Sequence, residues 1–170
     1  MGSLTGKKVL VVLAPKDFQD KEFFKSRVSL QAAGAELLTA AEGVEEATGV
    51  LGGKAKVDAD LNKINLKDYT ALVFIGGSGA KVYFKQKQVL ALVREAAAQK
   101  KVIGAICIAP TILANAGILQ GKKVTSFPSE EKNLTAAGAR YTGRPVEADG
   151  KIVTANGPEA AEAFGEKLVE

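Results

Sequence analysis

The 170-residue sequence contains no histidine, and this absence excludes several kinds of catalytic site. Without imidazole the chain cannot form a Cys–His or Ser–His–Asp group, and it lacks the usual nitrogen ligand of zinc. A proton donor or acceptor in this protein must therefore be a carboxylate, a lysine, a tyrosine or water. We expect the protein to hold no metal ion.

Cysteine, aromatic residues and long apolar runs are also scarce. The single cysteine, Cys107, cannot form an internal disulfide, which is typical of a reducing cytosol. No uncharged apolar run reaches the roughly 18 residues that span a membrane, and residues 1–9 lack the apolar middle of a signal peptide. Aromatic residues make up 6% and do not alternate with a basic cluster, so the net charge of +4 does not indicate nucleic-acid binding. We expect a cytoplasmic protein that binds neither membranes nor nucleic acids.

The residues that are present indicate one folded domain over residues 1–170. Apolar residues make up 46% and charged residues 25%, as in ordinary soluble domains. Apolar runs predict strands at residues 8–14, 35–41, 71–75, 102–106 and 123–126. Helices are predicted up to residue 34 and at residues 86–100, 110–119, 128–137 and 158–168.

Turn residues separate these segments, with hairpins predicted at Gly52–Gly53 and Asp149–Gly150. Strands that alternate with helices predict an α/β fold, in which a mostly parallel sheet is covered on both faces. In such sheets a site lies beyond the carboxyl ends of the strands. The segments that follow residues 14, 75 and 106 should therefore meet at one edge.

Cys107 lies at one of these edges, between the strand at 102–106 and a helix opened by Pro110. There a side chain projects beside the free N–H groups of the helix, which stabilise a thiolate and a developing oxyanion. A lone cysteine can also be a small buried apolar residue, but its place at the turn favours a nucleophile. The helix dipole contributes only about 0.3–1 kcal/mol, less than one pKa unit, so activation also needs hydrogen bonds.

Three carboxylic acids follow the first strand and could supply such a bond: Asp17, Asp20 and Glu22. An ionised carboxylate would raise the pKa of the thiol by repulsion, so a useful partner must be protonated, which burial achieves. Glu22 precedes two phenylalanines and has the most apolar setting of the three. Alternatively, Glu22 only complements the N-terminus of its helix.

The segment Gly76-Gly77-Ser78-Gly79 follows another predicted strand. It matches neither the phosphate-loop pattern nor the dinucleotide pattern, and we expect no cofactor. The segment can simply be a tight turn. We favour a role in an oxyanion hole, in which the N–H groups of Gly77 and Ile108 converge and glycine permits a close approach.

The motifs KVLVVLA, ALVFIGGSGA, VIGAICIAPTILANAGILQGKKVTSFP and DGKIVTANGP resemble the DJ-1/ThiJ/PfpI superfamily, whose fold is related to class I glutamine amidotransferases. The resemblance covers residues 7–168. It implies a flavodoxin-like three-layer sandwich, usually dimeric, with Cys107 on a strained nucleophile elbow. It also implies a protonated Glu22 hydrogen-bonded to the sulfur. We assign Gly76, with Gly77 and Ile108, to the backbone of the oxyanion site, and Phe127 and Pro158 to the pocket.

The sequence departs from this superfamily at two positions. Members of the PfpI type carry a histidine directly after the cysteine, where this chain has Ile108, and members of the DJ-1 type carry one at the position of Phe127. Peptidase activity is therefore not expected, nor is glyoxalase- or deglycase-like chemistry that uses histidine for proton transfer. The remaining Cys–Glu pair suits hydration of small electrophiles or reversible oxidation of the cysteine.

Three functions follow from these residues. In the first, Cys107 attacks a small electrophilic carbon, Glu22 relays the proton, and the amides of Gly77 and Ile108 stabilise the charge, giving hydrolase- or hydratase-type detoxification. In the second, the protein is a redox sensor, stress-response or chaperone-like protein whose Cys107 is oxidised beside Glu22. In the third, Ile108 and Phe127 fill the pocket of a catalytically inactive interaction module.

Overall fold

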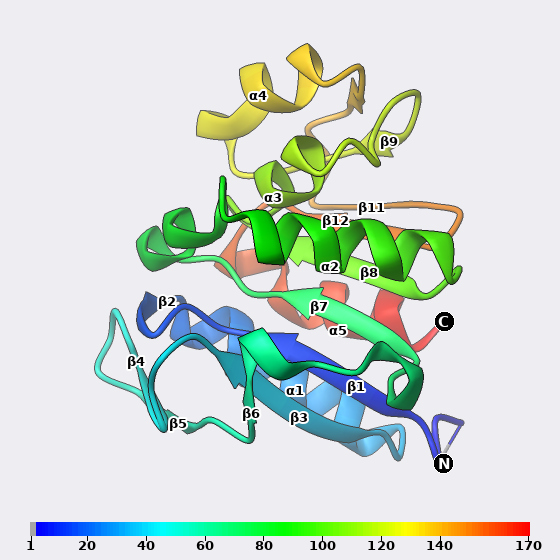
Figure 1. Ribbon diagram of the computed structural model, residues 1–170. Helices are drawn as coiled ribbons and strands as arrows, with labels where there is room; N and C mark the ends of the chain where they lie inside the picture. The colour runs from blue at the N-terminus through cyan, green and yellow to red at the C-terminus, as the bar shows by residue number, and fades with distance from the viewer. Residues whose placement is uncertain (1–2) are drawn as a thin grey trace.

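The computed structural model describes residues 3–170 as strands and helices in three layers. The central sheet has the strand order β11-β12-β8-β7-β1-β3-β6 (Figure 1). Its strands are β1 (Lys8–Val12), β3 (Glu36–Ala41), β6 (Ala59–Asp60), β7 (Ala71–Phe74), β8 (Val102–Ile106), β11 (Val146–Asp149) and β12 (Ile152–Ala155). Neighbouring strands are parallel, except that β11 and β12 form an antiparallel hairpin.

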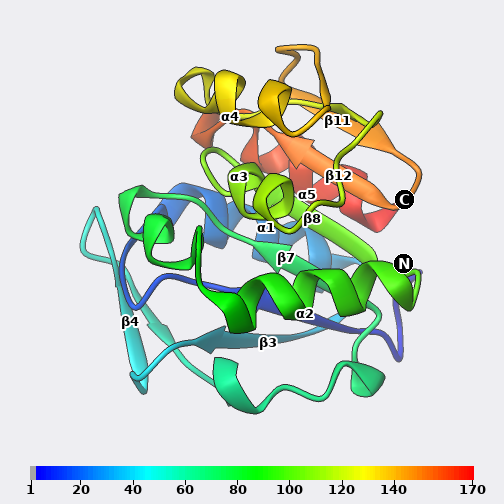
Figure 2. The same ribbon diagram turned by 45° about the horizontal axis from the view of Figure 1, so that its top comes forward.

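Helices cover both faces of this sheet. Helices α1 (Asp20–Ala32) and α5 (Ala161–Val169) pack against each other on one face. Helices α2 (Lys87–Ala98) and α3 (Pro110–Asn115) lie on the opposite face, with α4 (Glu131–Ala136) beyond α3 (Figure 2).

Successive side chains of each central strand pack alternately into two separate apolar cores, one on each face of the sheet. Leu10 and Val12 of β1 belong to the core under α2 and α3, whereas Val9 and Val11 belong to the core under α1 and α5. This alternation follows from the two-residue period of a strand. It explains why the central strands are apolar at nearly every position and have no polar face.

Shorter elements connect the strands and helices of the three layers. A small sheet contains β2 (Lys16–Phe18), β4 (Glu46–Gly49) and β5 (Lys54–Lys56), and a two-stranded one contains β9 (Lys123–Val124) and β10 (Arg140–Tyr141). Single turns of 3-10 helix occupy Leu61–Lys63, Leu66–Asp68, Pro128–Glu130 and Pro158–Ala160, and a longer one occupies Ser78–Tyr83. No helix within residues 3–170 is both long and apolar enough to cross a bilayer.

The predicted fold class, a mostly parallel α/β sandwich, is confirmed. Both predicted hairpins are present, at β4–β5 and β11–β12. The helix predicted to extend to residue 119 is wrong in length, because α3 ends at Asn115. Gly117, with φ 84°, adopts the left-handed conformation that ends helices. The strand predicted at 123–126 is also shorter, since β9 contains only Lys123–Val124.

Candidate active site

Cys107 forms a sharp elbow between β8 and α3. Its φ of 66° lies in the left-handed region, which costs a residue other than glycine about 1–2 kcal/mol. Two backbone hydrogen bonds hold the elbow: the Cys107 N–H donates to the carbonyl of Ala155 at 2.9 Å, and the Phe127 N–H donates to the carbonyl of Cys107 at 2.8 Å. The neighbouring strand and the segment after β9 therefore impose this strained conformation.

The start of α1 brings Glu22 to this elbow. The Gln19 side chain caps the helix by accepting from the Lys21 N–H at 2.9 Å. The Gln19 N–H donates to the carbonyl of Gly76 at 2.9 Å, which ties the helix start to the turn after β7. Glu22, three residues later, is fully buried. The two segments that follow β1 and β7 thus meet beside the segment that follows β8, as the sheet topology predicts.

The two carboxyl oxygens of Glu22 have different surroundings. Oε1 accepts a hydrogen bond from the Gly76 N–H at 2.8 Å. Oε2 is buried and has no hydrogen-bond partner of standard geometry. Because Oε1 already accepts an N–H, the proton of a neutral Glu22 belongs on Oε2. Oε2 is therefore the oxygen that can donate a proton toward Cys107, whose thiol interacts with this carboxyl group.

Gly76 lies between Glu22 and the elbow, so close to both that only glycine fits there. A Cβ at this position would lie 2.6 Å from Cβ of Cys107, 2.7 Å from Oε1 of Glu22 and 2.7 Å from the carbonyl oxygen of Ile106. Next to it, Gly77 has φ 100°, and its own Cβ would overlap the backbone of residues 17–19. The glycines of this turn allow three backbone segments to meet at the sulfur.

Burial controls the ionisation of Glu22. It raises the pKa of the carboxyl group from 4.5 to about 8, although the hydrogen bond from Gly76 and the interaction with Cys107 lower it. Glu22 is therefore neutral at pH 7. This is the protonated state that a partner of the thiol must have.

Burial also raises the pKa of the Cys107 thiol, and an ionised Glu22 would raise it further, while the backbone amides of Gly77 and Ile108 lower it. The sequence pointed only to the helix N-terminus, which lowers the pKa of a thiol. At this elbow, desolvation of the Cys107 thiol raises its pKa by more than the backbone amides lower it. Because Glu22 keeps its proton up to about pH 8, repulsion between the two groups is absent at neutral pH.

We expect Glu22 to make the stability of the protein depend on pH. Between pH 4.5 and about 8 the unfolded chain releases the Glu22 proton while the folded chain keeps it. The folded state then binds more protons, so the free energy of unfolding should fall as pH rises through this window. Urea denaturation of Glu22→Gln at pH 5 and pH 8 should show a smaller fall than the parent. Equal decreases in the free energy of unfolding of the two proteins would contradict the raised pKa of Glu22.

The other predicted residues lie around Cys107 in different ways. Ile108 is 8% exposed and Cys107 9%, so the Cys107 side chain is recessed. Phe127 is 45% exposed, although its backbone binds the elbow. Pro158 begins a helical turn next to Gly157, whose Cβ position lies 3.8 Å from the Phe127 ring. Phe127 thus lies close to the turn that begins at Pro158, and the role of these two residues in a pocket remains a prediction.

Asp17 and Asp20, the alternative acids, have other roles. Asp17 adopts a left-handed φ of 65° in β2. The carboxylate of Asp20 accepts hydrogen bonds from the backbone N–H groups of Leu51 at 2.8 Å and Gly53 at 2.7 Å. It therefore anchors the tip of the β4–β5 hairpin. Of the three acids, Glu22 is the one that reaches Cys107.

Sequence reasoning missed a buried polar cluster on the far side of the elbow. Glu130, 6% exposed, accepts hydrogen bonds from Thr111 at 2.7 Å, Ser129 at 2.7 Å and Asn133 at 3.1 Å. Thr111 lies on the first turn of α3, so the cluster fixes the helix after Cys107 to the segment after Phe127. The sequence offered only a weak signal, an acid shortly after Pro128, which indicates a helix start.

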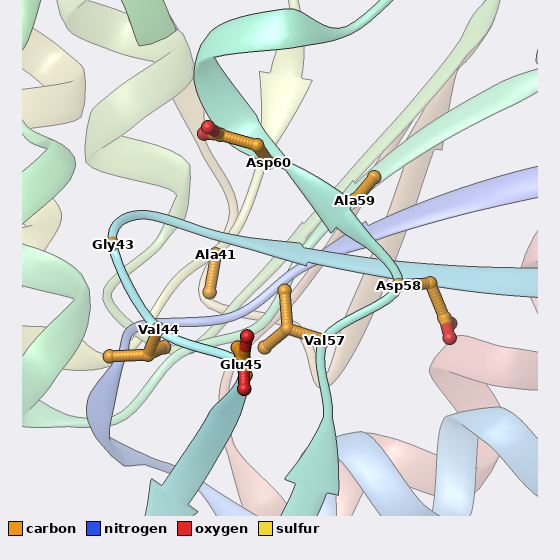
Figure 3. Close-up of a pocket in the computed structure, with 8 residues that line it drawn as sticks. All are labelled: Ala41, Gly43, Val44, Glu45, Val57, Asp58, Ala59 and Asp60. Atoms are coloured by element: carbon orange, nitrogen blue, oxygen red, sulfur yellow. The ribbon is translucent and has the colours of Figure 1, made fainter.

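A separate acidic hollow of about 300 Å³ lies beside β3 and β6 at the edge of the sheet. Its carboxylates belong to Glu45, Asp58 and Asp60 and point in different directions (Figure 3). Asp58 already accepts from the N–H of Thr39 at 3.0 Å. Within the described part of the chain, no three acidic, cysteine or histidine side chains form a group that could hold a metal ion.

Known proteins share this architecture. The DJ-1/PfpI family model matches residues 7–170. An uncharacterized protein of Methanocaldococcus jannaschii is 39% identical over 96% of this chain and 81% of its own length. A protein named a deglycase, from Pyrococcus horikoshii, is 29% identical over 96% of this chain and 98% of its own.

Among solved structures, a ThiJ/PfpI domain protein of Brachyspira murdochii superimposes with a TM-score of 0.94 at 28% identity, covering 97% of this chain and 95% of that one. The residues that the family model matches include the elbow, the Gly76 turn and the start of α1. The chain belongs to the DJ-1/PfpI family.

Proposed function

We propose that the protein is a cysteine-dependent enzyme that adds the Cys107 sulfur to a small electrophilic carbon and releases the product by hydrolysis. One observation carries this proposal: Glu22 is fully buried, Gly76 fixes its Oε1, Oε2 has no other partner, and the carboxyl group interacts with the Cys107 thiol. Burial raises the pKa of Glu22 to about 8, which keeps this acid neutral at pH 7. A neutral acid next to a nucleophile can both give and accept a proton during attack. Neither the donation nor the acceptance of this proton requires histidine.

The proton balance of this step involves Glu22 alone. As the carbon–sulfur bond forms, the π bond of the electrophile breaks and its electron pair moves to the oxygen or nitrogen. Glu22 gives its proton to that atom and accepts the thiol proton, so it ends neutral. The amides of Gly77 and Ile108, which already interact with the sulfur, are close enough to stabilise charge that develops near it. With an amide, the adduct then expels the amine, which leaves with a proton, and water attacks the resulting thioester to release the acid and restore the thiol. With an aldehyde, the hemithioacetal exchanges its sulfur for water, which releases the hydrate and restores the thiol.

A screen of small aldehydes, amides and isocyanides with the purified protein tests the proposal. Turnover should fall above about pH 8, because Glu22 then ionises, loses the proton that it must give and repels a thiolate. Glu22→Gln should be slow at every pH and should lack this alkaline fall, whereas Glu131→Gln, an exposed change on α4, should keep the parent profile. No turnover of any compound in the screen would contradict the enzyme proposal.

Oxidation of Cys107 is the second candidate function. The free Oε2 proton of Glu22 and the amides of Gly77 and Ile108 could also stabilise a sulfinate, in which the thiol has been oxidised by peroxide with uptake of two oxygen atoms. Intact-mass measurement after peroxide treatment reports this uptake directly. Uptake without turnover in the screen would favour the redox function, and an unreactive thiol would favour an interaction module.

The homodimer implied by the resemblance remains a prediction. Apolar side chains that a partner could cover are present: Val28 on α1 is 64% exposed, and Leu51 on the β4–β5 hairpin is 66% exposed. The cytoplasmic location likewise remains a prediction.

A further inference from the structure

A second hollow lies at the opposite end of the sheet from Cys107. Lys101 directly precedes β8 and Lys151 directly precedes β12, whereas Cys107 follows the end of β8. In Figure 1 the end of α2, the start of β8 and the turn between β11 and β12 occupy the same side of the molecule. The hollow between them has a volume of about 330 Å³, which is large enough for one small molecule.

Its surface combines an apolar floor with a basic rim. Ile103 and Ile118 contribute to the floor, and Lys100, Lys101, Lys122 and Lys151 all line the hollow, with no acidic residue among the lining side chains. The four lysines come from three separate segments: two follow α2, one precedes β9, and one lies in the β11–β12 turn. The fold, rather than a basic run in the sequence, gathers their charges.

These charges are not neutralised within residues 3–170. The ammonium group of Lys101 donates to the carbonyl of Tyr69 at 2.5 Å, and those of Lys100, Lys122 and Lys151 have neither a hydrogen bond nor an ion pair in this part of the chain. The nearest acids in the sequence are engaged elsewhere. Glu95 accepts from the side chain of Gln99, and Asp149 accepts from the backbone N–H of Lys123.

A purely local explanation accounts for only half of this cluster. Lysines that follow a helix interact favourably with its C-terminal dipole, which suffices for Lys100 and Lys101 after α2. It does not explain Lys122 or Lys151, which lie at no helix end. Lys100 also has φ 58°, the left-handed conformation in which glycine usually ends a helix, so a lysine is present where the backbone favours glycine.

We propose that this hollow binds a small amphipathic organic anion, with a carboxylate, sulfate or phosphate group at the lysines and a short apolar body on the isoleucine floor. Uncompensated positive charge attracts the head group, and the partly exposed Ile118, above the buried Ile103 and Ile152, offers apolar surface that an apolar body would cover. The size of the hollow limits the ligand to one soluble molecule and does not suit a membrane surface. The site is independent of Cys107 and of the proposed enzyme activity.

Isothermal titration with octanoate tests the proposal in the full-length protein. Octanoate should bind, and both acetate, which lacks the apolar body, and 1-octanol, which lacks the charge, should bind at least about tenfold more weakly. Raising the salt concentration should weaken octanoate binding, because the head-group contacts are partly exposed. Cys107→Ser should bind octanoate as the parent does.

Two double variants with the same loss of charge sharpen this test. Lys122→Gln/Lys151→Gln should weaken octanoate binding about tenfold or more, whereas Lys85→Gln/Lys132→Gln, which changes exposed lysines elsewhere, should change it less than twofold. Equal affinities in the two double variants would overturn the proposal. So would acetate binding as tight as octanoate, or tighter binding to phosphatidylglycerol vesicles than to octanoate.

Discussion

Cys107→Ser is expected to lower kcat/KM for the best electrophile of the screen by at least about 10³-fold, the range found when a catalytic nucleophile is removed. The serine hydroxyl stays protonated far above the pH at which a thiol ionises, and it is a weaker nucleophile. The change should leave the free energy of unfolding within about 1 kcal/mol of the parent, because the two side chains have nearly the same shape. Both backbone hydrogen bonds that hold the elbow are independent of the sulfur atom.

The experiment has a clear readout because Cys107 is the only thiol in the chain. Mass spectrometry after peroxide or iodoacetamide treatment should show modification of the parent and none of Cys107→Ser. Urea denaturation shows whether the variant is folded before its activity is interpreted. Full turnover by a folded Cys107→Ser variant would exclude the nucleophilic role of Cys107.

Features that depend on local sequence were predictable. Strands β1, β7 and β8 are apolar at almost every position because both of their faces are buried, so their runs are visible without knowledge of the fold. The placement of Cys107 beside the Gly76 turn follows from one topological rule, that parallel strands share a carboxyl edge. The apolar neighbours of Glu22 and the family resemblance together favour it over Asp17 and Asp20. In the folded chain Glu22 is fully buried, whereas Asp20 is bonded to the β4–β5 hairpin.

Features that depend on contacts between distant segments were not predictable. Glu130 is 19 residues from Thr111, and nothing in either segment indicates that a buried hydrogen bond joins them. The lysine hollow gathers side chains from three separate segments. The raised pKa of Cys107 is a further example, because desolvation depends on how closely α1, the Gly76 turn and β12 pack around the sulfur. Composition and spacing carry no information about that packing.

Gly76→Ala is the second change with a large expected effect, because the site depends on a close approach that one methyl group would prevent. The new Cβ would meet Cβ of Cys107, the carbonyl of Ile106 and Oε1 of Glu22 at 2.6–2.7 Å. The first two atoms belong to the elbow and β8, which backbone hydrogen bonds hold in place, so they cannot move freely. We expect a loss of about 1–3 kcal/mol in the free energy of unfolding and, from displacement of the acid relative to the thiol, a loss of about 100-fold in turnover.

Gly157→Ala is the matched control for stability. Gly157 has an extended backbone that any residue can adopt, and its Cβ would lie at an ordinary 3.8 Å from the Phe127 ring. Urea denaturation should therefore show a much smaller change for Gly157→Ala than for Gly76→Ala. The double variant Gly76→Ala/Glu22→Ala should recover part of the lost stability, because it removes one of the three overlaps, and this non-additivity would locate the strain at the Glu22 contact. If Gly76→Ala were as stable and as active as the parent, the close packing of Glu22, Gly76 and Cys107 would not be what holds the acid at the sulfur.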